Sequence, residues 1–128
     1  MPNVNFEQLI ARVERGAVRR LPAPAVVAFN ARLHRLIGEP ELAELRRLVR
    51  PASAAIDVGG HFGTYTHALA RHVGRHGRVV TFEPIAEDAE LIRRAARWLR
   101  LPVHVICAAV SNRAGEAELT IPRLGTHE

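Results

Sequence analysis

Residues 54–66 constrain the fold more than any other stretch of this sequence. A short apolar run contains Asp57, and a helical pattern begins at Thr64. Between them lie three glycines: Gly59, Gly60 and Gly63. Because glycine has no Cβ, the chain can turn sharply here and a ligand can approach the backbone. The stretch therefore predicts the strand, glycine-rich turn and helix that open a nucleotide-binding βαβ unit, with free N–H groups at the first helical turn.

The rest of the C-terminal part alternates between strand and helix patterns. Strands are predicted at 54–58, 78–83 and 103–110, and helices at 64–76 and 86–100. The second strand is almost entirely β-branched or aromatic, which is typical of a buried parallel strand. A half-exposed strand is predicted at 116–121, where apolar and polar residues alternate. This order predicts an α/β fold with a doubly wound, Rossmann-like sheet.

The N-terminal part of the chain is predicted to be helical. Amphipathic patterns predict helices at 6–20, at 25–37 and in a short stretch that begins at Pro40. We therefore divide the chain into a helical segment, 1–52, and a sheet-forming domain, 53–128. We expect the helices to pack on the sheet domain or on a partner chain, because their apolar stripes need cover.

Composition narrows the class of protein. The chain has 128 residues and a formal net charge of +5, and all its cationic side chains except histidine are arginines. Aromatic residues make up only 5%, so stacking platforms for bases are scarce and we expect no nucleic-acid partner. Cys107 is the only cysteine, which favours a reducing, cytoplasmic setting. We expect no signal peptide and no membrane-spanning segment.

An acidic residue lies in register with the glycine loop. Glu83 ends the second predicted strand, twenty residues past Gly63. In a doubly wound sheet ligands bind beyond the carboxyl ends of the strands, where such a carboxylate can accept hydrogen bonds from both ribose hydroxyls. The alternative is a purely structural glutamate at a strand end. On the ribose interpretation, replacing Glu83 with alanine weakens ligand binding and changes folding little.

The loop spacing and charge distinguish between two nucleoside ligands. A dinucleotide site requires Gly-x-Gly-x-x-Gly, whereas this loop is Gly-Gly-x-x-Gly. Asp57 places a negative charge just before the loop, which opposes a pyrophosphate. The same charge favours the ammonium and sulfonium groups of S-adenosylmethionine. A nicotinamide-dependent enzyme remains the disfavoured alternative.

Three motifs in order resemble the FkbM-type methyltransferases. They are Ile56-Asp57-Val58-Gly59-Gly60-His61-Phe62-Gly63, then Val79-Val80-Thr81-Phe82-Glu83-Pro84, then Ala108-Ala109-Val110-Ser111-Asn112. The resemblance implies a class I S-adenosylmethionine-dependent fold and O-methyl transfer, to a small-molecule or glycan acceptor. It implies donor contacts at Asp57, Gly59, Gly60, His61, Gly63 and Glu83, with Ser111 and Asn112 near the adenine. Gly60 stands where the family usually has alanine, and we expect it to loosen the loop.

The resemblance covers the first half of such an enzyme. The family continues with an Asp-x-Glu-Gly strand and an acceptor pocket, whereas this sequence ends at Glu128. We therefore expect weak or no turnover from this chain alone, a truncated or split reading frame, and self-association through the N-terminal helices or an open sheet edge. No catalytic residue is assigned. The alternative is a non-catalytic fragment or nucleoside-binding module.

Other residue types suggest no further chemistry. His72 and His76 have a spacing that can chelate a metal, but no third ligand follows, so we expect surface histidines and no metal site. Cys107 is expected in the core of the third strand, and Trp98 on a helix flank. Three arginines are expected to share one solvated face of the last helix: Arg93, Arg97 and Arg100.

Overall fold

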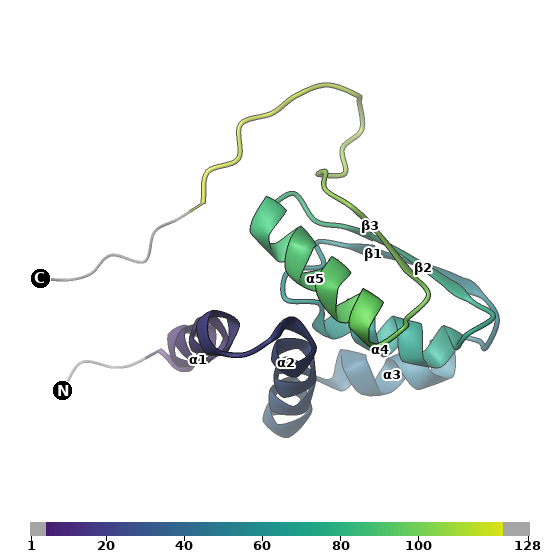
Figure 1. The fold of residues 1–128 in the computed structure, drawn as a ribbon, viewed down its shortest axis with the longest axis horizontal. Helices are drawn as coiled ribbons and strands as arrows, with labels where there is room; N and C mark the ends of the chain where they lie inside the picture. The colour runs from purple at the N-terminus through teal and green to yellow at the C-terminus, as the bar shows by residue number, and fades with distance from the viewer. Residues whose placement is uncertain (1–4, 122–128) are drawn as a thin grey trace, which may run out of the picture.

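A computed structural model describes residues 5–121 of the chain (Figure 1). Within them the helices are α1 (Phe6–Arg20), α2 (Ala23–Ile37), α3 (Pro40–Leu48), α4 (Thr64–Val73) and α5 (Ala86–Trp98). The strands are β1 (Ala54–Val58), β2 (Arg78–Phe82) and β3 (Val103–Ile106). The predicted order of elements, three helices followed by alternating strands and helices, is confirmed as far as β3.

The three strands form one parallel sheet in the order β1-β2-β3. Ile56 lies opposite Val80, and Val80 lies opposite His104, so the register is continuous across the sheet. Parallel neighbours require crossover connections, which α4 and α5 provide. Both helices pack on the same face of the sheet (Figure 1), as successive right-handed crossovers in one direction demand.

The core lies between this face and the two crossover helices. One apolar cluster joins α4 to β2 and contains Leu69, Ala70, Val73 and Val79. A second joins α5 to β3 and contains Ala89, Ile92 and Val105. Outside them, α2 packs on both α4 and α5, α3 packs on α4, and α1 packs on α2. The N-terminal helices thus form an outer layer that contacts the crossover helices.

The opposite face of the sheet is open in the described part of the chain. Ile56 and Val58 point away from the helices and are 68% and 61% exposed. β1 is also an edge strand of this sheet. Its side chains are nevertheless apolar on both faces, except at Asp57. A strand of this composition is typical of a sheet that is covered on both faces.

Several element ends differ from the prediction for local reasons. α4 stops at Val73 rather than near residue 76, because Gly74 adopts a positive φ of 68° and caps the helix. α5 ends at Trp98, just before Arg100, which has a φ of 52°. α2 begins at Ala23, which places Pro24 in its first turn, where a missing N–H costs no hydrogen bond.

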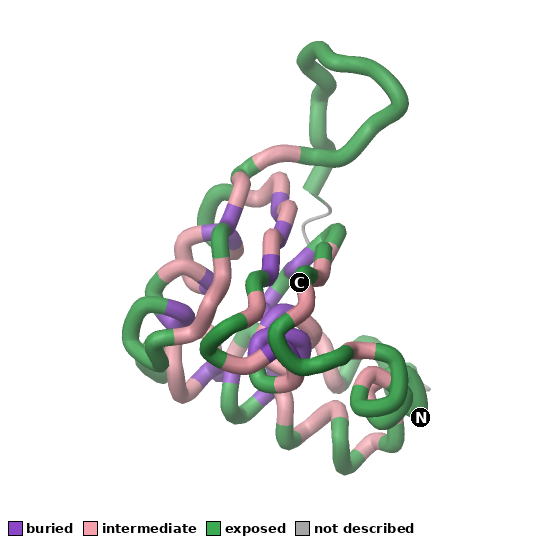
Figure 2. The backbone as a smooth tube through the Cα atoms, turned by 90° about the vertical axis from the view of Figure 1, so that its right-hand side faces the viewer, coloured by how far each residue is buried: buried purple, intermediate pink, exposed green. Residues whose placement is uncertain are grey.

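The segment after β3 departs most from the prediction. β3 ends at Ile106, and residues 107–121 contain neither helix nor strand, so the strand predicted at 116–121 is wrong. Figure 2 shows this segment as an exposed loop that stands away from the sheet. Alternation alone does not form a strand, because each strand needs a neighbour for its backbone hydrogen bonds.

Two side chains lie in different surroundings from those predicted. Cys107 follows the end of β3 and is exposed, so its expected place in the core is wrong. Trp98 closes α5 with 78% of its surface exposed. Each residue lies two positions beyond the last buried residue of its helix or strand, Ala96 in α5 and Val105 in β3.

Candidate functional site

The glycine loop, residues 59–63, joins β1 to α4 through a tight backbone turn. The N–H groups of Gly59 and Gly60 both donate to the Phe82 carbonyl oxygen at the end of β2, at 2.8 and 3.2 Å. Gly59 and Gly63 have positive φ angles of 81° and 82°, which glycine adopts without steric cost. Between them His61 has a φ of 47°, a left-handed conformation that is uncommon for a residue with a Cβ.

Gly60 is the most tightly enclosed position of the loop. A Cβ there would lie 2.4 Å from Thr81 Cγ2 and 2.8 Å from Ile92 Cδ1. The expectation that Gly60 loosens the loop is therefore wrong, because the absence of a side chain lets the backbone sit directly on β2 and α5. Gly59 is the opposite case, since its Cβ position has no atom within 4 Å and the backbone there is open to a ligand.

Glu83 lies beside this loop, as the sequence predicts. The residue is 4% exposed. Its Oε2 accepts a hydrogen bond of 2.7 Å from the His61 N–H, and its Oε1 accepts one of 2.8 Å from the Ile85 N–H. A carboxylate has about four acceptor sites, so these two bonds leave capacity for hydroxyl groups. Glu83 is thus a structural brace of the loop as well as a candidate ligand contact.

Asp57 faces the helix layer. Its Oδ2 accepts a hydrogen bond of 2.6 Å from the Thr66 hydroxyl in α4, and that hydroxyl in turn accepts one of 3.2 Å from Thr81. Burial raises the pKa of the Asp57 carboxyl above its ordinary value, the Thr66 hydrogen bond opposes this, and the charge of Glu83 adds to it. Asp57 at β1 and Glu83 after β2 therefore place two acidic side chains on neighbouring strands at the side of the glycine loop.

His61 ties the loop to α5, a contact that sequence reasoning missed. Its Nδ1 lies 3.1 Å from Asp88 Oδ2, and its ring stacks on Phe62 with a centroid distance of 3.7 Å. The hydrogen bond to Asp88 raises the pKa of His61, although burial opposes it. The available signal was the acidic first turn of α5, where a carboxylate also suits the helix dipole.

The remaining predicted site residues lie apart from this loop. Ser111 and Asn112 are exposed in the segment after β3, with Ser111 Oγ 3.4 Å from Asn112 Oδ1. Among the described residues they make no hydrogen bond to the loop or to Glu83. The structure therefore brings together the predicted residues of β1, the glycine loop and β2, and leaves out those after β3.

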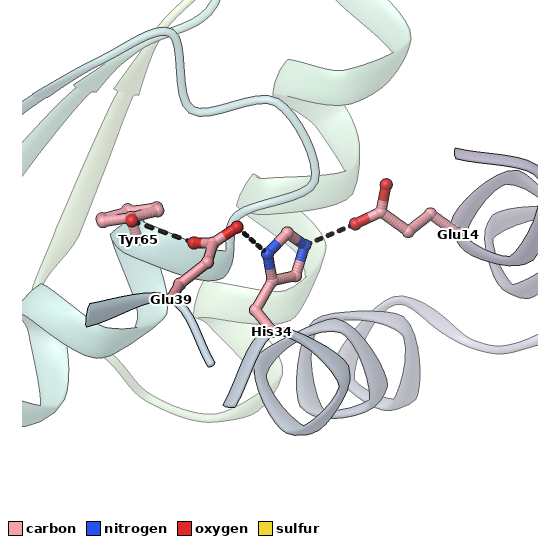
Figure 3. A network of polar contacts seen from close by, with 4 residues as sticks. All are labelled: Glu14, His34, Glu39 and Tyr65. Carbon is pink, nitrogen blue, oxygen red and sulfur yellow. Dashed lines mark hydrogen bonds and ion pairs between the residues drawn. The ribbon is translucent and has the colours of Figure 1, made fainter. Parts of the chain in front are cut away.

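A second polar network braces the start of α4 (Figure 3). His34 of α2 lies between two carboxylates, with Nε2 2.6 Å from Glu14 Oε1 and Nδ1 2.5 Å from Glu39 Oε1. The Tyr65 hydroxyl donates to Glu39 Oε2 at 3.0 Å. The network thus connects α1, α2 and the turn before α3 to the second residue of α4. Glu14 and Tyr65 are 20 and 26 residues from their partners in this network, so no local pattern signals it.

The network perturbs its own titrating groups. Burial lowers the pKa of His34, but the hydrogen bonds and charges of Glu14 and Glu39 outweigh it, so the net shift is upward. Burial and the bond to Glu39 raise the pKa of Tyr65 to about 12. The imidazolium form of His34 is therefore the form that this site stabilises.

Two other kinds of site are not found in the part of the chain that the structure describes. No group of three or more histidine, cysteine, aspartate or glutamate side chains is arranged to hold a metal ion. No helix between residues 5 and 121 has both the length and the apolar character needed to cross a membrane.

Comparisons with known proteins support the fold. No protein-family model and no curated protein matches the sequence. Among solved structures, a proposed rRNA methylase from Clostridium thermocellum superposes with a TM-score of 0.52 at 22% identity, over 55% of this chain and 40% of that one. An S-adenosylmethionine-dependent methyltransferase from Aquifex aeolicus gives a TM-score of 0.52 at 23% identity, over 66% of this chain and 46% of that one.

These likenesses define the fold class. The parallel sheet, its two crossover helices and the glycine turn after β1 form part of a Rossmann-like α/β fold, which this chain shares with these two solved structures. This chain spans less than half the length of either solved structure.

Proposed function

We propose that residues 53–128 form the donor-binding half of an S-adenosylmethionine-dependent methyltransferase, and that the FkbM resemblance of the three motifs reflects this function. The finer proposal is O-methyl transfer to a small-molecule or glycan acceptor. The fold class supports the reaction class, and the motifs support the family. The cytoplasmic location expected from the single cysteine belongs to the same proposal.

One observation carries the proposal: the hydrogen bond from the His61 N–H to Glu83 Oε2. It joins the glycine loop and the acidic end of β2 at the carboxyl edge of the sheet, where doubly wound folds bind nucleosides. Gly59 leaves the backbone beside them open. The arrangement fits a nucleoside whose ribose hydroxyls reach Glu83.

The chain's own residues suit a cationic donor. Asp57 and Glu83 are both acidic, and the loop has the spacing Gly-Gly-x-x-Gly instead of the Gly-x-Gly-x-x-Gly of a pyrophosphate-binding turn. S-adenosylmethionine would supply a methyl group on a sulfonium centre for transfer to an acceptor oxygen. Asp57, Gly59, Glu83 and the loop backbone would bind and orient that donor, so catalysis would come mainly from positioning. Ser111 and Asn112 remain proposed adenine contacts, which requires the segment after β3 to approach the loop.

The open sheet face affects the methyl-transfer activity that we expect from this chain. β1 is an edge strand with exposed Ile56 and Val58, and nothing among residues 5–121 covers that face. We infer that further strands and helices complete the sheet beside β1 and supply the acceptor pocket. Weak or no turnover is therefore the expected behaviour of these 128 residues by themselves. A nucleoside-binding module without a reaction is the competing function.

Calorimetry tests the donor site directly. Titration of the purified chain with S-adenosylhomocysteine is expected to give saturable binding, and titration with NAD is expected to give none or much weaker binding. Glu83→Gln should weaken S-adenosylhomocysteine binding about tenfold, as loss of one charged hydrogen bond predicts. Glu90→Gln removes an equal charge on the exposed part of α5 and serves as the control. Preferential binding of NAD, or equal binding by a folded Glu83→Gln variant, would overturn the proposal.

A further inference from the structure

A hollow of about 800 Å³ lies among α2, α3 and α4, separate from the open edge beside Gly59. Small or apolar side chains from all three helices line it: Ala31, Leu42, Ala43 and Ala68. Thr64, the first residue of α4, also reaches it. A volume of this size falls within the range of about 300–1,000 Å³ that is typical of small-molecule sites.

Each of the three helices contributes one arginine to the lining. Arg35 comes from α2, Arg46 from α3 and Arg71 from α4. None of the three makes an ion pair with any residue between 5 and 121. Other arginines of these and neighbouring helices do pair, such as Arg47 with Glu44 and Arg94 with Glu90. The hollow therefore gathers three cationic groups that have no ion-pair partner among residues 5–121.

The one acidic side chain in the lining is already engaged. Glu39 interacts with His34 through Oε1 and accepts the Tyr65 hydroxyl through Oε2. The charge of Glu39 is thus shared with the His34 network and is not directed to the arginines. The remaining titratable groups of the lining are two half-buried histidines, His67 and His72.

The pKa of His67 is affected by the positive charges around the hollow. Burial lowers its pKa, and the charges of Arg71 and then Arg35 lower it further. Both arginines therefore act on the same interior point from different helices. A neutral imidazole at this point can also donate one hydrogen bond to an anion.

We propose that this hollow binds a phosphate-bearing small molecule, with Arg35, Arg46 and Arg71 as its anion contacts. Guanidinium groups match phosphate oxygens in a bidentate geometry, and a phosphate monoester or diphosphate concentrates two or more negative charges in one compact group. A single carboxylate would leave most of the arginine charge unpaired. The methyl donor is excluded as the ligand, because its sulfonium and ammonium groups would face three cations.

The site does not depend on the proposed methyltransferase function. Its residues come from the N-terminal helices and the outward side of α4, whereas the donor contacts come from the glycine loop and the end of β2. Binding at one site can therefore be lost while binding at the other is kept.

Calorimetry of the full chain with pyrophosphate at low ionic strength tests the proposal. Saturable binding is expected, and Arg35→Gln and Arg71→Gln should each weaken it about threefold to fivefold, as loss of one exposed ionic contact predicts. Arg75→Gln removes the same charge at an exposed position just beyond α4 and outside the hollow, so it should leave the affinity unchanged. In NMR spectra the His67 ring resonances should shift on addition of pyrophosphate, and those of His76 should not.

Three results would overturn the proposal. The first is an equal loss of affinity in Arg75→Gln and Arg71→Gln, which would mean that only net charge matters. The second is no saturable pyrophosphate binding by the folded chain. The third is that an RNA oligonucleotide binds in an arginine-dependent way while pyrophosphate does not bind at all. This result would assign the surface to a nucleic acid. The affinity for S-adenosylhomocysteine should be the same in Arg71→Gln and in the wild type. A failure of the phosphate-site proposal is therefore distinguishable from a failure of the donor-site proposal.

Discussion

The buried carboxylate of Glu83 accepts a hydrogen bond of 2.7 Å from the backbone N–H of His61, 22 residues earlier in the chain. The same carboxylate accepts the Ile85 N–H, so it closes the turn after β2 as well. His61 has a left-handed backbone conformation, which such a contact helps to stabilise. The glycine loop and the end of β2 therefore behave as one structural unit.

Replacing Glu83 with alanine is therefore expected to affect folding as well as ligand binding, in contrast to the expectation from sequence. The substitution leaves two backbone N–H groups without their acceptor in a site that is 4% exposed, at a cost of about 2–4 kcal/mol. Urea unfolding followed by circular dichroism measures the change. Glu83→Gln keeps one acceptor oxygen and should cost less. An unchanged midpoint in Glu83→Ala would show that the loop does not depend on this carboxylate.

Gly60→Ala is expected to destabilise the chain by about 1–3 kcal/mol, because the new methyl group would overlap Thr81 and Ile92 in a packed core. Gly16→Ala is the matched control. Gly16 lies within α1, and its nearest neighbour, on Arg20, is 4.0 Å from the Cβ position. Alanine favours the helix there, so this variant should be about 0.5–1 kcal/mol more stable. Similar unfolding midpoints for the two variants would contradict the packing at Gly60.

The pH dependence of stability is expected to contain a contribution from His34. Its pKa is raised in the folded state, so its stabilising effect is complete below the unfolded value of 6.5. The effect is lost as the pH rises through the folded pKa, because the folded state then no longer binds the extra proton. Denaturant unfolding of the wild type and of His34→Gln at a series of pH values isolates this difference.

Other histidines also contribute to the pH dependence of stability in that experiment. His61 also has a raised pKa and acts in the same sense, whereas the lowered pKa of His67 acts in the opposite sense. The comparison must therefore be between variant and wild type at each pH. His76→Gln, at an exposed position, is the control and should retain the wild-type profile. A His34→Gln profile parallel to that of the wild type would argue against the network.

Self-association is expected to depend on the open sheet face. Ile56→Thr combined with Val58→Thr keeps β-branched side chains but removes apolar surface, so sedimentation velocity should show less oligomer than in the wild type. Leu9→Gln tests the other candidate surface, the exposed apolar side of α1. If only Leu9→Gln reduces association, the N-terminal helices are the contact surface.

The order of the elements and the position of the glycine loop follow from local sequence patterns. Residues 54–58 and 78–82 have the apolar, β-branched composition of buried strands, and the helices between them have a 3.6-residue period. Gly38 ends α2 with a φ of 78°, as glycine at a helix C-terminus does. These features depend on residues close together in the chain. For the same reason the sequence could place Glu83 at the end of a strand.

The contacts of each loop residue depend on packing between segments that are distant in the chain. Three contacts join residues about 20 to 30 positions apart, roughly the length of a βαβ unit: the enclosure of Gly60 by Thr81 and Ile92, the hydrogen bond from the His61 N–H to Glu83, and the pairing of His61 with Asp88. The segment after β3 also shows that a local pattern is not sufficient to form an element. Residues 116–121 alternate like a strand, yet they form none, because a strand is stabilised by hydrogen bonds to a neighbour and not by its own pattern.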